Sequence, residues 1–102
     1  MSELGLKQRK FTRMLADLII YAYDHGYSIS LGDAYANDGH SEGSLHYDRL
    51  AIDFNLFDLD GKYLRETEDH RFLGEQWESM GGSWGGRFKD GNHYSLEHEG
   101  RR

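Results

Sequence analysis

Apolar residues in the first quarter of the chain recur with the spacing of one face of an α-helix. These positions are Phe11, Met14, Leu15, Leu18 and Ala22. Residues three and four apart lie on the same side of a helix, so the pattern predicts an amphipathic helix with one buried face. Ser2 can cap its first turn, and Gly26 is typical of a helix end because glycine adopts the left-handed conformation without strain.

Two later segments alternate between apolar and polar residues, which is typical of strands with one buried face. The apolar face of residues 50–57 consists of Leu50, Ile52, Phe54 and Leu56. The polar face of residues 93–98 consists of His93, Ser95 and Glu97. Asp53 lies on the polar face of the first segment. If both strands belong to one sheet, Asp53 and His93 share its polar face and can meet.

The rest of the pattern predicts a second helix and shorter elements. We expect this helix over residues 67–80, with Thr67 as its cap, Gly81-Gly82 as its end and a buried stripe of Leu73, Trp77 and Met80. The other predicted elements are a strand in residues 27–31, a loop in 32–43, a turn in 58–61 and a glycine-rich loop in 81–92. The sequence therefore predicts an α+β fold, a small antiparallel sheet with two main helices, in a single domain over residues 1–102.

Composition narrows the classes of protein to which the chain can belong. Acidic residues outnumber basic ones, 18 to 12, and the net charge is −6. No basic stripe forms, which argues against nucleic-acid binding, and the cluster at residues 7–10 fits a solvated helix face. The chain has no cysteine, so it forms no disulfide and has no thiol chemistry. No segment approaches 18 apolar residues, so we expect no membrane insertion, and we expect a monomer.

Two short motifs carry candidate chemistry. The first is the segment from Ser44 to Asp53, which contains His46, and the second is Asp90-Gly91-Asn92-His93. Two imidazoles and a carboxylate are a sufficient ligand set for a catalytic zinc ion, with a fourth position left for water. Asp90, three residues before His93, is then a spare carboxylate that could act as a base.

The spacing of the first motif requires a bend in the chain. His46 and Asp53 are seven residues apart, which is about 10 Å along a helix and about 23 Å along a strand. Bonds to zinc are only about 2 Å long. We therefore expect the chain to turn between these residues, at Asp48-Arg49.

The spacing Ser44-x-His46-x-x-x-x-Ala51-x-Asp53, followed by Asp90-x-x-His93, resembles the zinc peptidases of bacterial cell walls. That family includes D-alanyl-D-alanine carboxypeptidases, VanX/VanY-type dipeptidases and the L-alanyl-D-glutamate endopeptidases of phage lysins. The resemblance covers about residues 27–98. It implies the small α+β fold shared with hedgehog signalling domains, zinc bound by His46, Asp53 and His93, and Asp90 as the general base.

The substrate-binding residues depart from the family pattern. The family usually has glycine where this chain has Arg49, and an upstream arginine that holds a substrate carboxylate, whereas residues 30–35 contain no arginine. Arg49 and Arg87 are candidates for that role, with surface ion pairs as the alternative. Trp84 is a candidate wall of the substrate site, with packing under the glycine-rich loop as the alternative.

Four further side chains are of types that could belong to the site. His98 is five residues after His93, so a regular strand turns it to the opposite face. His40 and His70 have no partner at ligand spacing, and we expect both at the surface. Glu97 shares the face of His93 and could orient a ligand, or it is an exposed strand carboxylate.

The expected function is hydrolysis of an amide bond in peptidoglycan stem peptides by a zinc metallopeptidase. Among the bonds, we favour L-alanyl-D-glutamate cleavage by a phage endolysin, because no family arginine is present to hold a terminal carboxylate and no secretory signal is visible. The enzyme would then stay in the host cytoplasm until release and act at the cell wall. The alternatives are a D-alanyl-D-alanine carboxypeptidase, a non-catalytic zinc-stabilised binding module, and a metal-free interaction domain.

Overall fold

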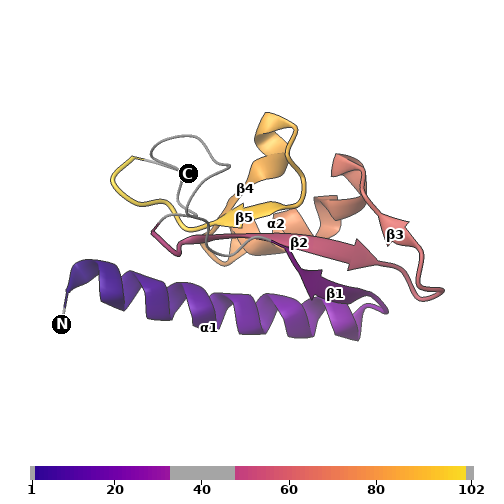
Figure 1. Ribbon diagram of the computed structural model, residues 1–102, viewed down its shortest axis with the longest axis horizontal. Coiled ribbons are helices and arrows are strands. Elements are labelled where there is room, and N and C mark those ends of the chain that lie inside the picture. Colours follow the sequence, from indigo (N-terminus) through magenta and orange to yellow (C-terminus); the bar gives the residue numbers. More distant parts are fainter. Residues whose placement is uncertain (1, 33–47, 101–102) are drawn as a thin grey trace.

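The structure, a computed structural model, describes residues 2–32 and 48–100. These residues form an α+β fold with two helices and a small antiparallel sheet, which confirms the predicted class (Figure 1). In chain order the elements are α1 (Glu3–Asp24), β1 (Ser28–Leu31), β2 (Ala51–Phe57), β3 (Tyr63–Leu64), the 3-10 helix η1 (Thr67–His70), α2 (Arg71–Ser79), β4 (Ser83–Trp84), the 3-10 helix η2 (Gly85–Phe88) and β5 (His93–Ser95).

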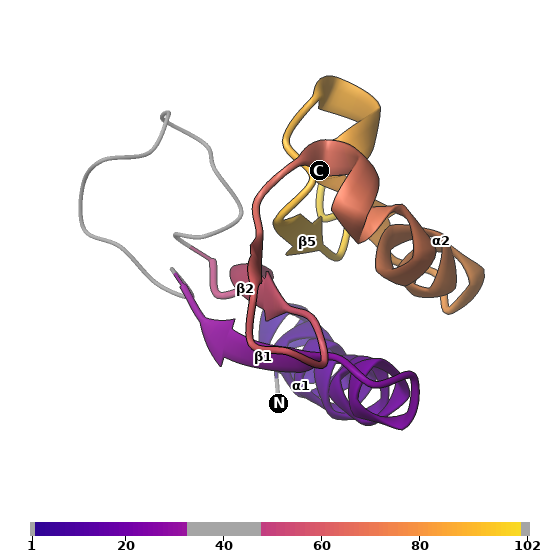
Figure 2. The same cartoon turned by 90° about the vertical axis from the view of Figure 1, so that its right-hand side faces the viewer.

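The sheet has the strand order β1-β2-β5-β4, and β3 pairs with β2 beyond this path. These four pairings, all between described strands, are antiparallel. Both helices lie on the same side of the sheet (Figure 2). The core between them includes Leu18 from α1, Phe54 from β2 and Trp77 from α2, each 0 % exposed. The opposite face of β2 and β5 is the face on which the alternation pattern places Asp53 and His93.

Helix α1 follows its predicted course. The hydroxyl of Ser2 accepts a hydrogen bond from the backbone N–H of Gly5 at 3.0 Å, which satisfies one of the free donors of the first turn. The chain leaves the helix through Gly26, whose φ of 87° lies in the left-handed region. No helix within residues 2–32 and 48–100 has the length and apolar character needed to cross a membrane.

The second helix begins differently from the prediction. Residues 67–70 form the 3-10 turn η1, and the α-helix starts only at Arg71. Thr67 does not cap it, because its hydroxyl instead accepts a hydrogen bond from the N–H of Gly91 at 3.3 Å. The carboxylate of Asp69 accepts the N–H of Glu66 at 3.1 Å and stabilises the tighter turn.

The segment predicted as a glycine-rich loop contains two short elements, β4 and η2. Its sequence shows no alternation, so the strand is specified by its partner: Ser83 pairs with Ser95, and Trp84 with Tyr94. Strand β5 in turn ends at Ser95 rather than at residue 98. Pairing between distant segments, which a local pattern does not contain, sets both boundaries.

The prediction of a surface position for His70 is wrong. This side chain is 1 % exposed, and its Nδ1 lies 2.8 Å from the hydroxyl of Tyr94. Burial lowers the pKa of His70 below its ordinary value of 6.5, against the opposing effects of the Asp69 charge and a backbone hydrogen bond at Leu64. The neutral imidazole is therefore part of the core. His40 lies outside the described residues.

This burial predicts a loss of stability in acid. Because the folded pKa of His70 is lowered, the unfolded chain binds a proton first as the pH falls below 6.5. The contribution of His70 is fully present above 6.5 and declines by up to about 1.4 kcal/mol per pH unit below it. Urea unfolding of the wild type and of His70→Gln between about pH 7.5 and 5.5 measures the difference in slope. Equal slopes for the two proteins would contradict the assignment.

Candidate metal and catalytic site

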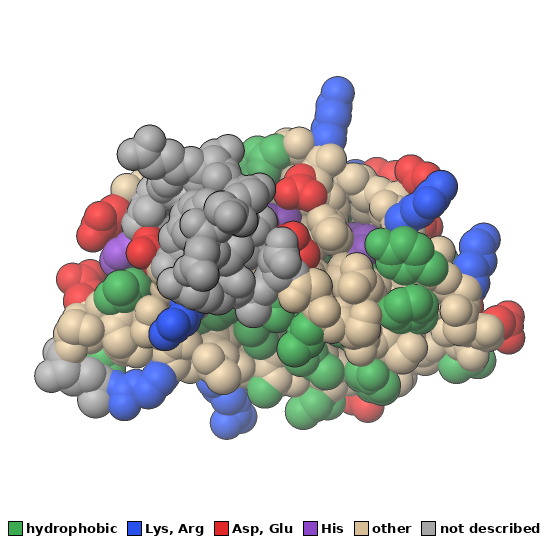
Figure 3. Space-filling model, viewed as in Figure 1, with side chains coloured by type: hydrophobic (Ala, Val, Ile, Leu, Met, Phe, Trp, Pro, Cys, Tyr) green, Lys and Arg blue, Asp and Glu red, His purple; other side chains and the backbone are tan. Residues whose placement is uncertain are grey.

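Asp53 and His93 are direct partners in the register of β2 and β5. The Oδ1 atom of Asp53 lies 3.5 Å from the Nδ1 atom of His93, and the two side chains are 23 % and 13 % exposed. The expected meeting of these residues on one polar face is confirmed. Figure 3 shows histidine and carboxylate side chains next to one another near the centre of this face.

The separation of these two atoms fits two ligands of one zinc ion. Zinc bonds of 2.0–2.2 Å arranged tetrahedrally place neighbouring ligand atoms about 3.4 Å apart. The distance of 3.5 Å between the carboxylate oxygen and the ring nitrogen is close to this value. A carboxylate and an imidazole are also the ligand types that zinc accepts in catalytic sites.

The third predicted ligand, His46, lies outside the described residues. Within the described parts of the chain, no group of three or more histidine, cysteine, aspartate or glutamate residues is placed to hold a metal ion. The structure thus brings together two of the three predicted ligands, Asp53 and His93. The assignment of His46 as the third ligand rests on the sequence motif alone.

Asp90 lies at the start of a tight turn that leads into β5. Its carbonyl oxygen accepts the N–H of His93 at 3.1 Å, and its own N–H donates to the carbonyl of Gly85 at 2.9 Å. The side chain is exposed. The backbone therefore holds the candidate base and the candidate ligand at the two ends of one turn.

Gly85 allows this turn to pack closely, a role that the sequence did not reveal. A Cβ atom at this position would lie 2.7 Å from the Cβ of His93 and still closer to the carbonyl oxygen of Asp90. Real Cβ atoms do not approach other atoms at such distances, so only glycine fits. The signal in the sequence was a glycine five residues before Asp90, but it did not stand out in a segment with several glycines.

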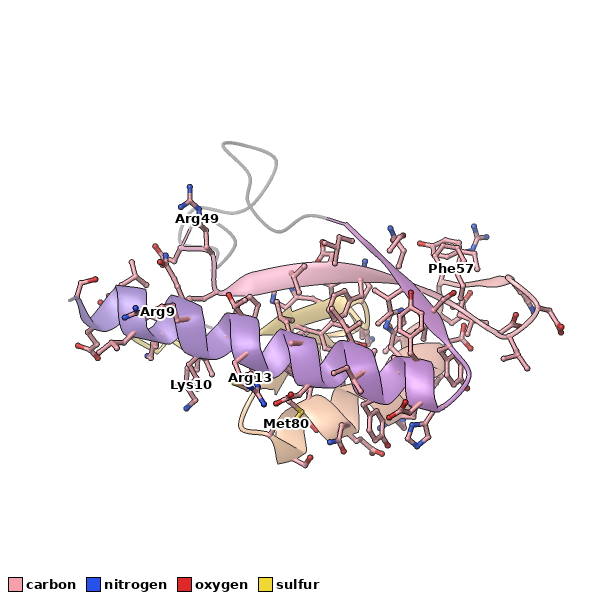
Figure 4. All side chains as sticks on the ribbon, turned by 90° about the horizontal axis from the view of Figure 1, so that it is seen from below. Arg9, Lys10, Arg13, Arg49, Phe57 and Met80 are labelled. Carbon is pink, nitrogen blue, oxygen red and sulfur yellow. The ribbon has the colours of Figure 1, made fainter. Side chains whose placement is uncertain are left out.

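The chain turns at Asp48-Arg49, as the spacing of the first motif predicted. Arg49 has a φ of 58°, in the left-handed region that favours glycine, the residue that the family usually has there. The carbonyl of Asp48 accepts a hydrogen bond from Nε2 of Gln8 at 2.8 Å, which ties the turn to α1. The exposed Arg49 side chain projects away from the sheet (Figure 4).

Replacing Arg49 with Gly is expected to stabilise the protein by about 0.5–1 kcal/mol, because it removes left-handed strain that exceeds the entropy cost of a glycine. Urea unfolding at an unchanged m value measures the gain. Arg13→Gly on the exposed face of α1 is the control, and it should cost about 0.7–1 kcal/mol. A loss of stability in Arg49→Gly would mean that side-chain contacts of Arg49 outweigh the strain.

Arg87 takes part in an ion pair, the alternative that the sequence left open. Its Nε and Nη2 atoms donate to the two carboxylate oxygens of Glu78 at 2.9 and 2.6 Å, and its guanidinium lies 5.2 Å from the ring centre of Trp84. The bond to Glu78 raises the pKa of Arg87. Arg87 and Glu78 also line a polar pocket of about 190 Å³, together with Gly81, Gly82, Ser83 and Glu97.

Trp84 is a packing residue, the alternative that the sequence left open. Its side chain is 1 % exposed. The Nε1 atom donates to the carbonyl of Gly91 at 2.7 Å, and the ring covers Gly74 of α2, where a Cβ atom would overlap it. A buried ring with its only polar atom bonded internally has no face for a substrate.

Two side chains after β5 are placed by other contacts. Glu97 is exposed, and because β5 ends at Ser95, strand alternation no longer places it beside His93. His98 is 7 % exposed, and its two ring nitrogens lie 3.2 Å from Nζ of Lys7 and 3.3 Å from Oε1 of Glu99. His98 is thus held against α1.

A family model described as D-alanyl-D-alanine carboxypeptidase matches residues 38–96. The chain belongs to this peptidase family. The matched segment contains all four residues of the proposed site: His46, Asp53, Asp90 and His93. A search among curated proteins finds no match. Membership identifies the chain as a peptidase of a family that acts on peptidoglycan-type substrates, and family peptidases are generally zinc-dependent.

Proposed function

We propose that this family member is a zinc-dependent endopeptidase that hydrolyses the L-alanyl-D-glutamate bond of peptidoglycan stem peptides, as an endolysin does. The observation that carries the proposal is the pair formed by Asp53 and His93, whose ligand atoms are separated by the edge of a zinc tetrahedron. Asp90 lies one turn away on the same backbone segment.

In this proposal His46, Asp53 and His93 hold the ion, with His46 assigned from the motif alone. Zinc would supply Lewis acidity toward the substrate carbonyl and lower the pKa of water. The two imidazoles bind a metal only in their neutral form, so activity should fall in acid. Strands β2 and β5 hold Asp53 and His93 in place through their backbone pairing, which limits the movement of both side chains.

Asp90 is the proton carrier. Its carboxylate accepts a proton from the water that attacks the amide carbonyl, and it later donates that proton to the leaving amine. The hydroxyl group of the water remains on the new carboxyl terminus of the substrate. The Asp90 carboxylate is regenerated when its proton passes to the leaving amine. The exposure of Asp90 allows water and substrate to reach it. A binding module would have no use for this carboxylate, which argues against the non-catalytic alternative.

The choice of bond follows from the arginines. A carboxypeptidase must hold the terminal carboxylate of its substrate, and the upstream segment has no arginine for this purpose. Arg87 is already bonded to Glu78 through two nitrogens. An endopeptidase cuts inside the peptide and needs no such clamp. The second candidate is D-alanyl-D-alanine carboxypeptidase action, which the description of the matching family model favours.

Digestion of purified muropeptides separates these possibilities. We expect new N-terminal D-glutamate, identified by mass spectrometry, that disappears with a chelator and returns when zinc is added. Release of free D-alanine alone would replace the endopeptidase by the carboxypeptidase. Cleavage that persists in chelator would contradict the proposed zinc dependence. The absence of cleavage of any stem peptide would contradict the proposed peptidase activity on peptidoglycan.

A further inference from the structure

Both backbone polar groups of Gly91, the residue after Asp90, are held by side chains from other segments. The N–H of Gly91 donates to Oγ1 of Thr67 at 3.3 Å. The carbonyl of Gly91 accepts Nε1 of Trp84 at 2.7 Å. Thr67 begins η1, 24 residues before Gly91, so this contact joins the turn to a separate part of the chain.

The backbone of Thr67 packs directly against Gly91. Gly91 is buried, and a Cβ atom at this position would lie 2.6 Å from Cα of Thr67. The start of η1 therefore lies directly against the backbone of the turn. A shift of Gly91 toward η1 is blocked by this contact, and a shift away from it breaks the hydrogen bond to the Thr67 hydroxyl.

The rest of the turn is fixed at both ends. Asp90 is bonded through its N–H to Gly85, and the carbonyl of Asn92 accepts the N–H of Phe54 at 2.9 Å. Gly91 connects Asp90 and Asn92, so its position sets how these two residues are oriented to one another. Because the Asp90 side chain is exposed, the backbone of this turn is what sets its direction. A general base must lie within hydrogen-bond reach of the proton that it removes, and small displacements lower the rate.

We propose that Thr67 is a positioning residue for Asp90, which acts by holding the N–H of Gly91. The role in catalysis rests on the proposed function, whereas the hold on Gly91 does not. The hydroxyl is the functional group, so a residue of the same shape without it should fail, and serine should replace threonine.

The first arm of the test compares Thr67→Val with Thr67→Ser in muropeptide cleavage. We expect Thr67→Val to lower kcat about tenfold, with KM and zinc content unchanged, and Thr67→Ser to restore kcat. Thr12→Val on the exposed face of α1 is the matched control, since the hydroxyl of Thr12 bonds within its own helix, to the carbonyl of Gln8. Wild-type kcat in Thr67→Val, or an equal loss in Thr67→Ser, overturns the proposal.

The second arm needs no activity. Amide hydrogen exchange of Gly91, followed by NMR, should be about tenfold faster in Thr67→Val than in the wild type, Thr67→Ser and Thr12→Val. Unchanged exchange at Gly91 overturns the proposal even if kcat falls. If the wild-type protein cleaves no stem peptide, the proposed function fails and the exchange rate still decides whether Thr67 holds the turn.

Discussion

Replacing Asp90 with Asn is expected to lower kcat about 10²–10⁴-fold, the usual loss when a general base is removed. The amide is almost the same size as the carboxylate but cannot accept the proton from water. Because Asp90 is not part of the proposed ligand set, zinc content should stay at one ion per chain. The backbone bonds of Asp90 to Gly85 and His93 do not involve its side chain, so the turn should remain folded.

Metal analysis, circular dichroism and muropeptide cleavage of the same Asp90→Asn preparation test this expectation. Asp60→Asn is the matched control, because Asp60 is exposed in the turn between β2 and β3. Wild-type turnover by Asp90→Asn at unchanged zinc content would remove Asp90 from the mechanism. Loss of zinc together with activity would instead make Asp90 a ligand.

Replacing His93 with Ala is expected to weaken zinc binding more than about 100-fold and to abolish cleavage. Losing a residue that merely orients a ligand already costs about 10–100-fold in affinity, so losing a ligand itself should cost more. The His46→Ala, His93→Ala double variant should hold almost no zinc after purification. A fully occupied double variant would reject this ligand set.

His98→Ala and His25→Ala are the controls for metal content. His98 is buried against Lys7, and His25 bonds the carbonyl of Tyr21 through Nδ1 at 2.7 Å, so neither belongs to the proposed site. Both variants should keep one zinc ion per chain. A loss of zinc in His98→Ala, but not in His93→Ala, would exchange the roles of these two histidines.

The elements with a strong local period were predictable from the sequence. The apolar face of α1 and the alternation along β2 each repeat over enough residues to indicate the element and its buried side. The same alternation placed Asp53 and His93 on one face, and the register of β2 and β5 confirms that they meet. The meeting of Asp53 and His93 was predictable because it requires only that both side chains lie on the same face of one sheet.

The sequence predictions that failed or stayed ambiguous concern residues whose positions are set by contacts with distant parts of the chain. Histidine is a polar residue type that is often exposed, and the buried His70 contacts the hydroxyl of Tyr94, 24 residues away in the chain. Thr67 resembles a helix cap, but its hydroxyl is used by Gly91 instead. Trp84 was ambiguous because an aromatic residue in a glycine-rich segment fits both a binding wall and a core, and only the contact with Gly74 decides between them.

The pairing of β2 with β5 has a consequence for the order of folding. Asp53 and His93 are 40 residues apart in the chain, whereas α1 forms from local contacts and β3 pairs with β2 across a short turn. Closing a long loop costs more entropy than closing a short one, so contacts between distant residues form late. We therefore expect the Asp53–His93 pair to form late in folding, and an emerging chain can complete the proposed site only once β5 has been made and has docked.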